Sequence, residues 1–151
     1  MIENLKTIFS RDLNRLKIEI ATYQDETHLW KISGDIKNSA GNLCLHLIGN
    51  LDTYIGAEIG KSGYIRNREL EFSLKDVPRA ELLMMIEQTI ITVNDALNKL
   101  SEVELEQKYP QIVLEGKTTT GFFLLHLTTH LSYHLGQINY HRRLIEQPKI
   151  V

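Results

Sequence analysis

Apolar residues recur at steps of three and four along most of the chain, which is the spacing of amphipathic helices. The first such stretch covers about residues 3–27, with Lys, Arg, Asp and Glu between its apolar positions. A loop containing Gly34 follows, and a second helix is predicted from residue 39 or 40 to about residue 59, where glycines stop it. The pattern therefore favours long helices from the start of the chain.

The segment between the second and third predicted helices, residues 64–77, is charged and only weakly periodic. We expect a long connection there. Asp76, Pro78 and Glu81 then supply an N-cap, an early-turn proline and first-turn negative charge for a third helix, which ends near residue 100.

The last periodic stretch predicts the longest helix. The threonines at residues 118–120 can cap it, and it reaches about Ile145, before Pro148. Four long helices without a convincing alternating strand predict an all-α protein, a four-helix bundle in which residues 1–151 form one domain.

Composition changes this picture mainly by excluding functions. Seventeen Lys and Arg face nineteen Asp and Glu, a formal charge of −2, so there is no basic excess for nucleic acid. The single cysteine, Cys44, cannot form an internal disulfide. The first residues do not resemble a signal peptide, and no apolar run has the length of a membrane span. We therefore expect a cytoplasmic protein with neither a nucleic-acid nor a membrane partner.

Histidines carry the candidate chemistry. Four of the six lie in the last predicted helix, at His126, His130, His134 and His141. At about 100° per residue they fall within about 80° of one another, on one stripe of the helix. Apolar neighbours predict that this stripe faces inward: Leu127, Leu131, Ile138 and Leu144. Buried imidazoles need partners for both ring nitrogens, and a metal ion would satisfy several of them at once.

A further ligand from another helix would strengthen such a site. His46 is the candidate, because it lies in the apolar run of residues 42–49 in the second helix. His130 and His134 have the four-residue spacing of metal ligands, but Leu131 stands where HExxH proteases carry their catalytic glutamate. Peptide hydrolysis by that route is therefore not expected.

These motifs resemble those of the DinB/YfiT-like superfamily of metal-dependent proteins. Residues 130–138 read HLSYHLGQI and resemble the family's HxxxHxGQI signature. Residues 38–47, NSAGNLCLHL, are similar to the segment that holds its first histidine, and residues 66–72, RNRELEF, resemble a charged segment of one subgroup. The family fold is a four-helix bundle, usually a homodimer, with a divalent ion, typically nickel or zinc, on three histidines.

The resemblance implies His46, His130 and His134 as the ligands. Five further residues are candidates for orienting a ligand or binding substrate: His126, Asn50, Gln137, Arg66 and Arg68. The resemblance places His126 beside the three ligands or as an alternate one. The two arginines could bind substrate carboxylates if their segment folds over the site; a solvated or dimer-contact role stays open for them. Tyr133 stands where the family often carries another histidine.

Three neutral imidazoles around one ion leave a coordination position open, as in catalytic sites. An ion there lowers the pKa of bound water or deprotonates a thiol. Several relatives are thiol-dependent transferases that use bacillithiol or mycothiol, so the leading hypothesis is attack of a metal-bound thiolate on an electrophile. The alternatives are a hydrolase that uses metal-bound water, and a metal-binding dimeric bundle without turnover.

Overall fold

The computed structural model describes residues 1–147. Within these residues every regular element is helical, and only an isolated antiparallel bridge joins Lys108 to Thr119. The prediction of an all-α protein is confirmed. The elements in chain order are α1 (Ile2–Thr22), η1 (Glu26–Trp30), α2 (Ala40–Leu51), η2 (Asp52–Ala57), α3 (Arg68–Ser73), α4 (Arg79–Asn98), α5 (Glu102–Glu106) and α6 (Thr120–Ile145). The predicted break at Pro148 lies outside the described residues.

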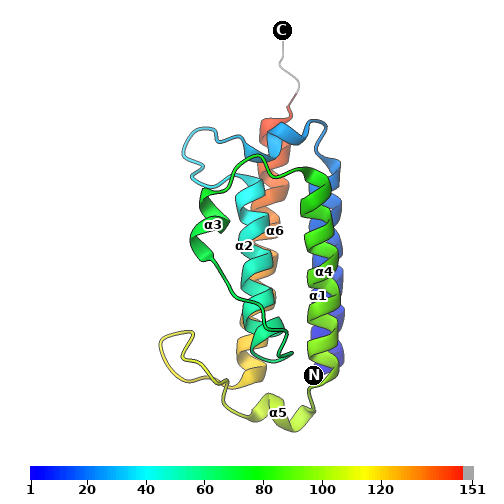
Figure 1. Ribbon diagram of the computed structural model, residues 1–151, viewed down its shortest axis with the longest axis vertical. Helices are drawn as coiled ribbons and strands as arrows, with labels where there is room; N and C mark the ends of the chain where they lie inside the picture. The colour runs from blue at the N-terminus through cyan, green and yellow to red at the C-terminus, as the bar shows by residue number, and fades with distance from the viewer. Residues whose placement is uncertain (148–151) are drawn as a thin grey trace.

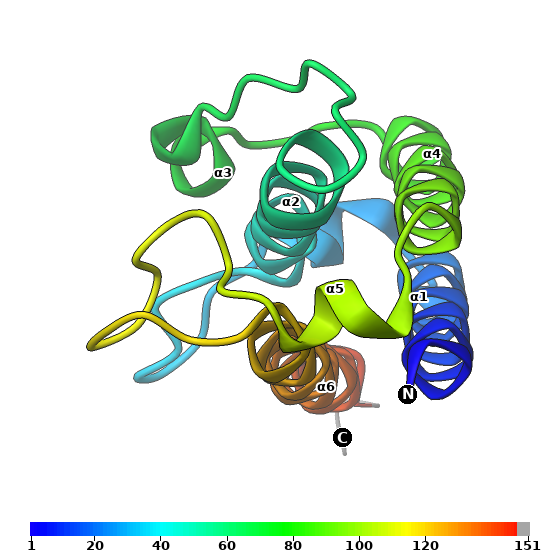
Figure 2. The ribbon, with the colours of Figure 1, turned by 90° about the horizontal axis from the view of Figure 1, so that it is seen from below.

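Four of these helices, α1, α2, α4 and α6, run alongside one another (Figure 1). Helix α1 packs on α4 and α6, and α2 packs on the same two helices from the other side. The view along the helices shows this arrangement, with α5 crossing one end and α3 outside α2 (Figure 2). The core between them is built from aliphatic side chains with a few aromatic rings.

Helix α2 has no solvent-facing side: all of its residues, Ala40–Leu51, are buried. Its outer face is covered by α3, which Asn42 holds in place. The side-chain amide of Asn42 donates to the carbonyl oxygens of Glu71 and Leu74, at 3.0 and 2.8 Å. Because a helix of six residues has little stability of its own, these bonds are needed to fix α3 on α2.

The first helix ends earlier than the sequence predicts. It stops at Thr22, and residues 23–27 are not part of it. Tyr23 leaves the helix with its ring buried and its hydroxyl 2.7 Å from His141 Nδ1. Asp25 then accepts a hydrogen bond from the backbone of Thr27 and caps the 3-10 helix η1. A buried tertiary contact and a local cap therefore override the continuing polar–apolar pattern.

Two expectations for residues 64–77 are also wrong. The segment is not only a connection, because it contains α3, capped by Asn67, whose side chain accepts from Leu70 N. Asp76 does not cap α4: its backbone has a φ of 56°, and Pro78 takes the N-cap position without a side-chain bond. The first free backbone N–H of α4, that of Arg79, is instead bound by a carboxylate oxygen of Glu26.

The ends of the second, third and last predicted helices agree with the sequence, whereas α5 was not predicted. The second helix continues as the π-helical turn η2 to Ala57, close to the expected end at residue 59. The last helix is capped by Thr119, whose hydroxyl accepts from Phe122 N, and ends at Ile145 as predicted. Among residues 1–147, no helix combines the length and the apolar character needed to cross a bilayer.

Candidate metal centre

Three histidines from α2 and α6 meet where these two helices pack together. His46 comes from α2, and His130 and His134 come from successive turns of α6. One ring nitrogen from each lies within 4.8 Å of the other two. The Nε2 atoms of His46 and His130 are 3.2 Å apart. Two nitrogens bound tetrahedrally to one zinc ion would be roughly 3.3 Å apart, so this spacing fits a shared ion.

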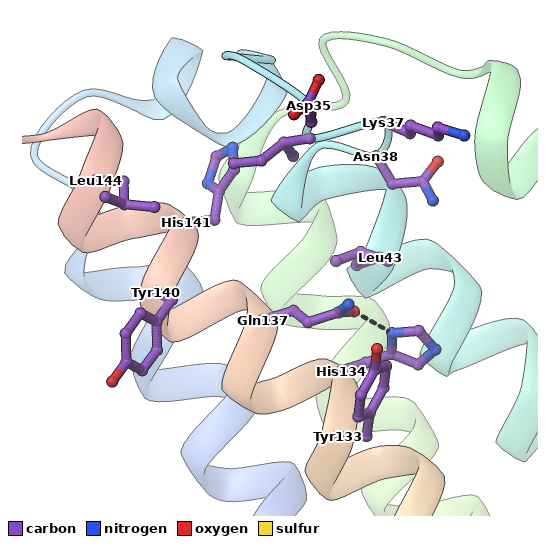
Figure 3. A pocket seen from close by; sticks show the side chains of 11 residues that line it. Asp35, Lys37, Asn38, Leu43, Tyr133, His134, Gln137, Tyr140, His141 and Leu144 are labelled. Atoms are coloured by element: carbon purple, nitrogen blue, oxygen red, sulfur yellow. Dashed lines mark hydrogen bonds between the residues drawn. The ribbon is translucent and has the colours of Figure 1, made fainter.

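The outer nitrogens of two of these rings are fixed by hydrogen bonds. His46 Nδ1 lies 3.0 Å from Glu71 Oε1, and His134 Nδ1 lies 2.7 Å from Gln137 Oε1 (Figure 3). Because both partners accept, each Nδ1 carries the proton and each Nε2 keeps its lone pair. This is the arrangement that orients metal-binding histidines in proteins.

Glu71 is held as a charged acceptor beneath His46. Its carboxylate accepts hydrogen bonds from Nε and Nη2 of Arg66, each at 2.8 Å. Glu71 is only 5% exposed. Burial alone would raise the pKa of Glu71, but the bonds from His46 and Arg66 together lower it. The close approach needs Gly49, since a Cβ at that position would overlap the Glu71 carboxylate.

His130 is the ring without an outer partner. Its Nδ1 is buried and bonds to none of residues 1–147. Burial, followed by the nearby His134 and His46, lowers the pKa of His130 to about 4, and burial also lowers the pKa of His134. Neutral imidazoles with converging nitrogens suit a divalent ion such as zinc or nickel, so this group could hold a metal ion.

The histidine cluster is accessible from two sides. A cavity of about 220 Å³ borders His46 and His130 and is lined also by Asn50, Tyr54, Arg66 and Arg68. A larger cavity, about 650 Å³, borders His134 on the other side, between α6 and residues 35–38 (Figure 3). A small molecule could therefore approach the three imidazoles from either cavity.

A comparison with protein families finds one model that covers nearly the whole chain. It is described as "Protein of unknown function (DUF1572)" and matches residues 2–150. The chain belongs to the DUF1572 family. No curated protein and no solved structure matches this DUF1572 chain.

The structure brings the other candidate residues of this DUF1572 protein to the same region in different ways. Asn50 is buried at the wall of the smaller cavity, and its Oδ1 has no hydrogen-bond partner among residues 1–147. His126 lines that cavity too, with its ring stacked on His130 at 6.5 Å between centroids, outside the group of three. Arg66 binds Glu71, and Arg68 is exposed above the Phe72 ring.

The predicted inward stripe of α6 holds only in part. Leu144 is 55% exposed and lines the larger cavity rather than the core (Figure 3). His141 is buried, but its ring nitrogens lie 2.7 Å from the Tyr23 hydroxyl and 2.8 Å from the Lys31 carbonyl. In this DUF1572 protein His141 therefore joins α1 and the loop after it to α6.

Cys44 is a small buried side chain within the core. It is fully buried, and burial raises the pKa of its thiol to about 12.

Two residues that matter for the site were not predicted from the sequence, Glu71 and Asn42. Both lie inside the motifs that carry the family resemblance, at residues 66–72 and 38–47. The signal that could have found them is a polar side chain, the Glu71 carboxylate or the Asn42 amide, beside apolar residues.

Proposed function

We propose that this protein holds one nickel or zinc ion on His46, His130 and His134 and transfers a low-molecular-weight thiol to an electrophile. The convergence of three imidazole nitrogens within 4.8 Å carries the first half of this proposal. The second half rests on the resemblance to the DinB/YfiT-like superfamily. The four-helix bundle type and the homodimer are proposed on the same resemblance. The packing of α1, α2, α4 and α6 supports that fold type.

The chain's own residues prepare the site for such an ion. Glu71 keeps the proton of His46 on Nδ1, and Gln137 does the same for His134, so that both Nε2 lone pairs face inward. Three protein ligands leave room for one more, and an ion bound there would lower the pKa of a thiol or of water. The cavities on both sides give a substrate access to that position.

One observation argues against an internal thiol as the nucleophile, and another argues against water. The thiol of Cys44 is fully buried with a raised pKa, so the chain offers no nucleophilic thiol of its own. The carboxylate nearest the cluster, Glu71, is bound by Arg66 and His46 and is not free to take a proton from water. In the proposed reaction the thiol gives its proton to solvent, its sulfur forms a bond to an electrophilic carbon, and the leaving group departs with the electron pair of the broken bond.

The metal assignment is tested by elemental analysis of three purified proteins. We expect the wild type and His126→Ala to contain stoichiometric metal, and His134→Ala to contain much less. His126→Ala is the matched control, because it removes a half-buried imidazole of the same helix that lies outside the group of three. Equal metal content in the wild type and His134→Ala would overturn the assignment.

The thiol assignment is tested on cobalt-substituted protein. Titration with L-cysteine and with bacillithiol should produce a thiolate-to-metal charge-transfer band, and the loaded protein should accelerate conjugation of the thiol to monochlorobimane. No band with either thiol would refute thiol transfer and favour a hydrolase. A band without conjugation would favour a metal-binding bundle without turnover. Sedimentation velocity tests the homodimer separately.

A further inference from the structure

The smaller cavity beside His46 and His130 is cationic. Arg66 and Arg68 line it from the segment before and at the start of α3, and Tyr54 lines it from η2. No carboxylate of residues 1–147 lines this cavity. The groups that face it are therefore mainly hydrogen-bond donors.

Without a metal ion on His46 and His130, the charge of the cavity is close to one positive unit. The guanidinium of Arg66 is neutralised by Glu71, to which it donates through Nε and Nη2, and its Nη1 is left for another acceptor. Arg68 lies over the Phe72 ring at 5.4 Å and has no ion-pair partner within the described part of the chain. A monoanion balances this charge better than a phosphate, which carries about 1.5 to 2 negative charges at neutral pH.

Asn50 adds a hydrogen-bond donor to the wall of this cavity. The residue is 8% exposed and lines the cavity, and no described side chain or backbone group bonds its amide. Its buried, unpaired Oδ1 is an acceptor, which an anion does not satisfy, so only Nδ2 bears on an anionic ligand. An anion in the cavity would accept a hydrogen bond from Asn50 Nδ2.

We infer that this cavity is the subsite for a carboxylate carried by the substrate thiol, bound by Arg68, Asn50 and the remaining Nη1 of Arg66. The inference rests on the proposed function, because it names the substrate class of the same site. A volume of about 220 Å³ accommodates a small acid, and His46 and His130 line the cavity together with the two arginines. The substrate is therefore a small thiol whose sulfur and carboxylate are a few bonds apart, so that one reaches the histidines while the other reaches the arginines.

The experiment uses metal-free protein, so that it does not depend on the metal centre. Mercaptoacetate and its neutral amide, mercaptoacetamide, are titrated while the Asn50 side-chain amide is followed by NMR. We expect mercaptoacetate to shift this signal saturably, with a Kd on the order of 1 mM. Arg68→Ala should weaken binding about fivefold. Arg143→Ala is the control, since Arg143 is an exposed arginine of α6 that lies over Tyr140 and does not line the cavity.

Each outcome decides the inference. Tighter binding of the acid than of the amide, lost in Arg68→Ala and kept in Arg143→Ala, supports it. Equal binding of acid and amide, equal effects of the two arginine variants, or no saturable shift would overturn it. Inorganic phosphate that displaces mercaptoacetate at lower concentration than acetate does would also overturn the carboxylate assignment. Metal content is measured on the same purified protein before its metal is removed, so the metal assignment can fail while the subsite is upheld, and the reverse.

Discussion

Replacing Glu71 by glutamine tests how the metal centre is oriented. The carboxylate accepts from His46 through Oε1 and from Arg66 through both oxygens. A glutamine has one accepting oxygen, and its amide N–H groups would face either His46 Nδ1–H or an N–H of Arg66. One contact must therefore be lost, and the Arg66 guanidinium, whose side chain is 14% exposed, keeps a charge that is no longer balanced.

Loss of a group that orients a metal-binding histidine lowers metal affinity by about 10- to 100-fold, or about 1.4 to 2.7 kcal/mol. The unbalanced Arg66 should cost a further 1.5 to 3 kcal/mol, roughly, in the free energy of unfolding. We therefore expect Glu71→Gln to bind zinc at least about tenfold more weakly in competition with a chromophoric chelator, and to unfold at lower urea concentration.

Glu69→Gln is the matched control, because it makes the same charge change in the same helix at an exposed position. Its zinc affinity and its urea midpoint should equal those of the wild type. A Glu71→Gln protein with wild-type circular dichroism and unchanged zinc affinity would refute the role we assign to this carboxylate.

Three further predictions concern stability. Burial raises the pKa of Asp52 to about 6, above its value in the unfolded chain, so this group costs stability as pH rises from about 4 to about 6. Asp52→Asn should stabilise the protein by about 1 kcal/mol at pH 7.5, allowing for its partial exposure, but not at pH 4; equal shifts in Tm at both pH values would contradict this. Removing the metal by chelation should lower the free energy of unfolding by up to about 4 kcal/mol, and Tm with it, while helicity at 25 °C is kept. A chelated protein without helical circular dichroism would show that the ion is structural. His141→Ala should cost about 2 to 4 kcal/mol in urea denaturation through its lost bonds to Tyr23 and Lys31, with metal content unchanged; a loss of metal would tie His141 to the centre.

The fold was predictable where local pattern and burial agree. Helix α6 has both a threonine cap and a long apolar stripe, and its bounds follow from them. Helix α3 was not predictable from periodicity, because six residues make fewer than two turns and its stability comes from Asn42 on another helix. The cap at Asp76 failed for a similar reason: Glu26, which is distant in sequence, binds the first N–H of α4.

The candidate site was predictable in its histidines and not in the groups that orient them. The four-residue spacing of His130 and His134 guarantees proximity on one helix, and His46 could be proposed because an imidazole in an apolar run needs a partner. Glu71 could not be placed, since its contact with His46 spans 25 residues and depends on the fold of a segment with no clear period. The same holds for Arg66, which the sequence places in a charged segment without revealing that it pairs with Glu71.

The position of Glu71 on α3 has a kinetic consequence. This short helix is tied to α2 by the two Asn42 bonds and by the contact of Glu71 with His46, so it can detach while the long helices remain packed. Detachment would free His46 to rotate and would uncover the cluster. We therefore expect the rate at which a bound ion exchanges with solution to follow the opening of residues 64–77, and to be far faster than global unfolding.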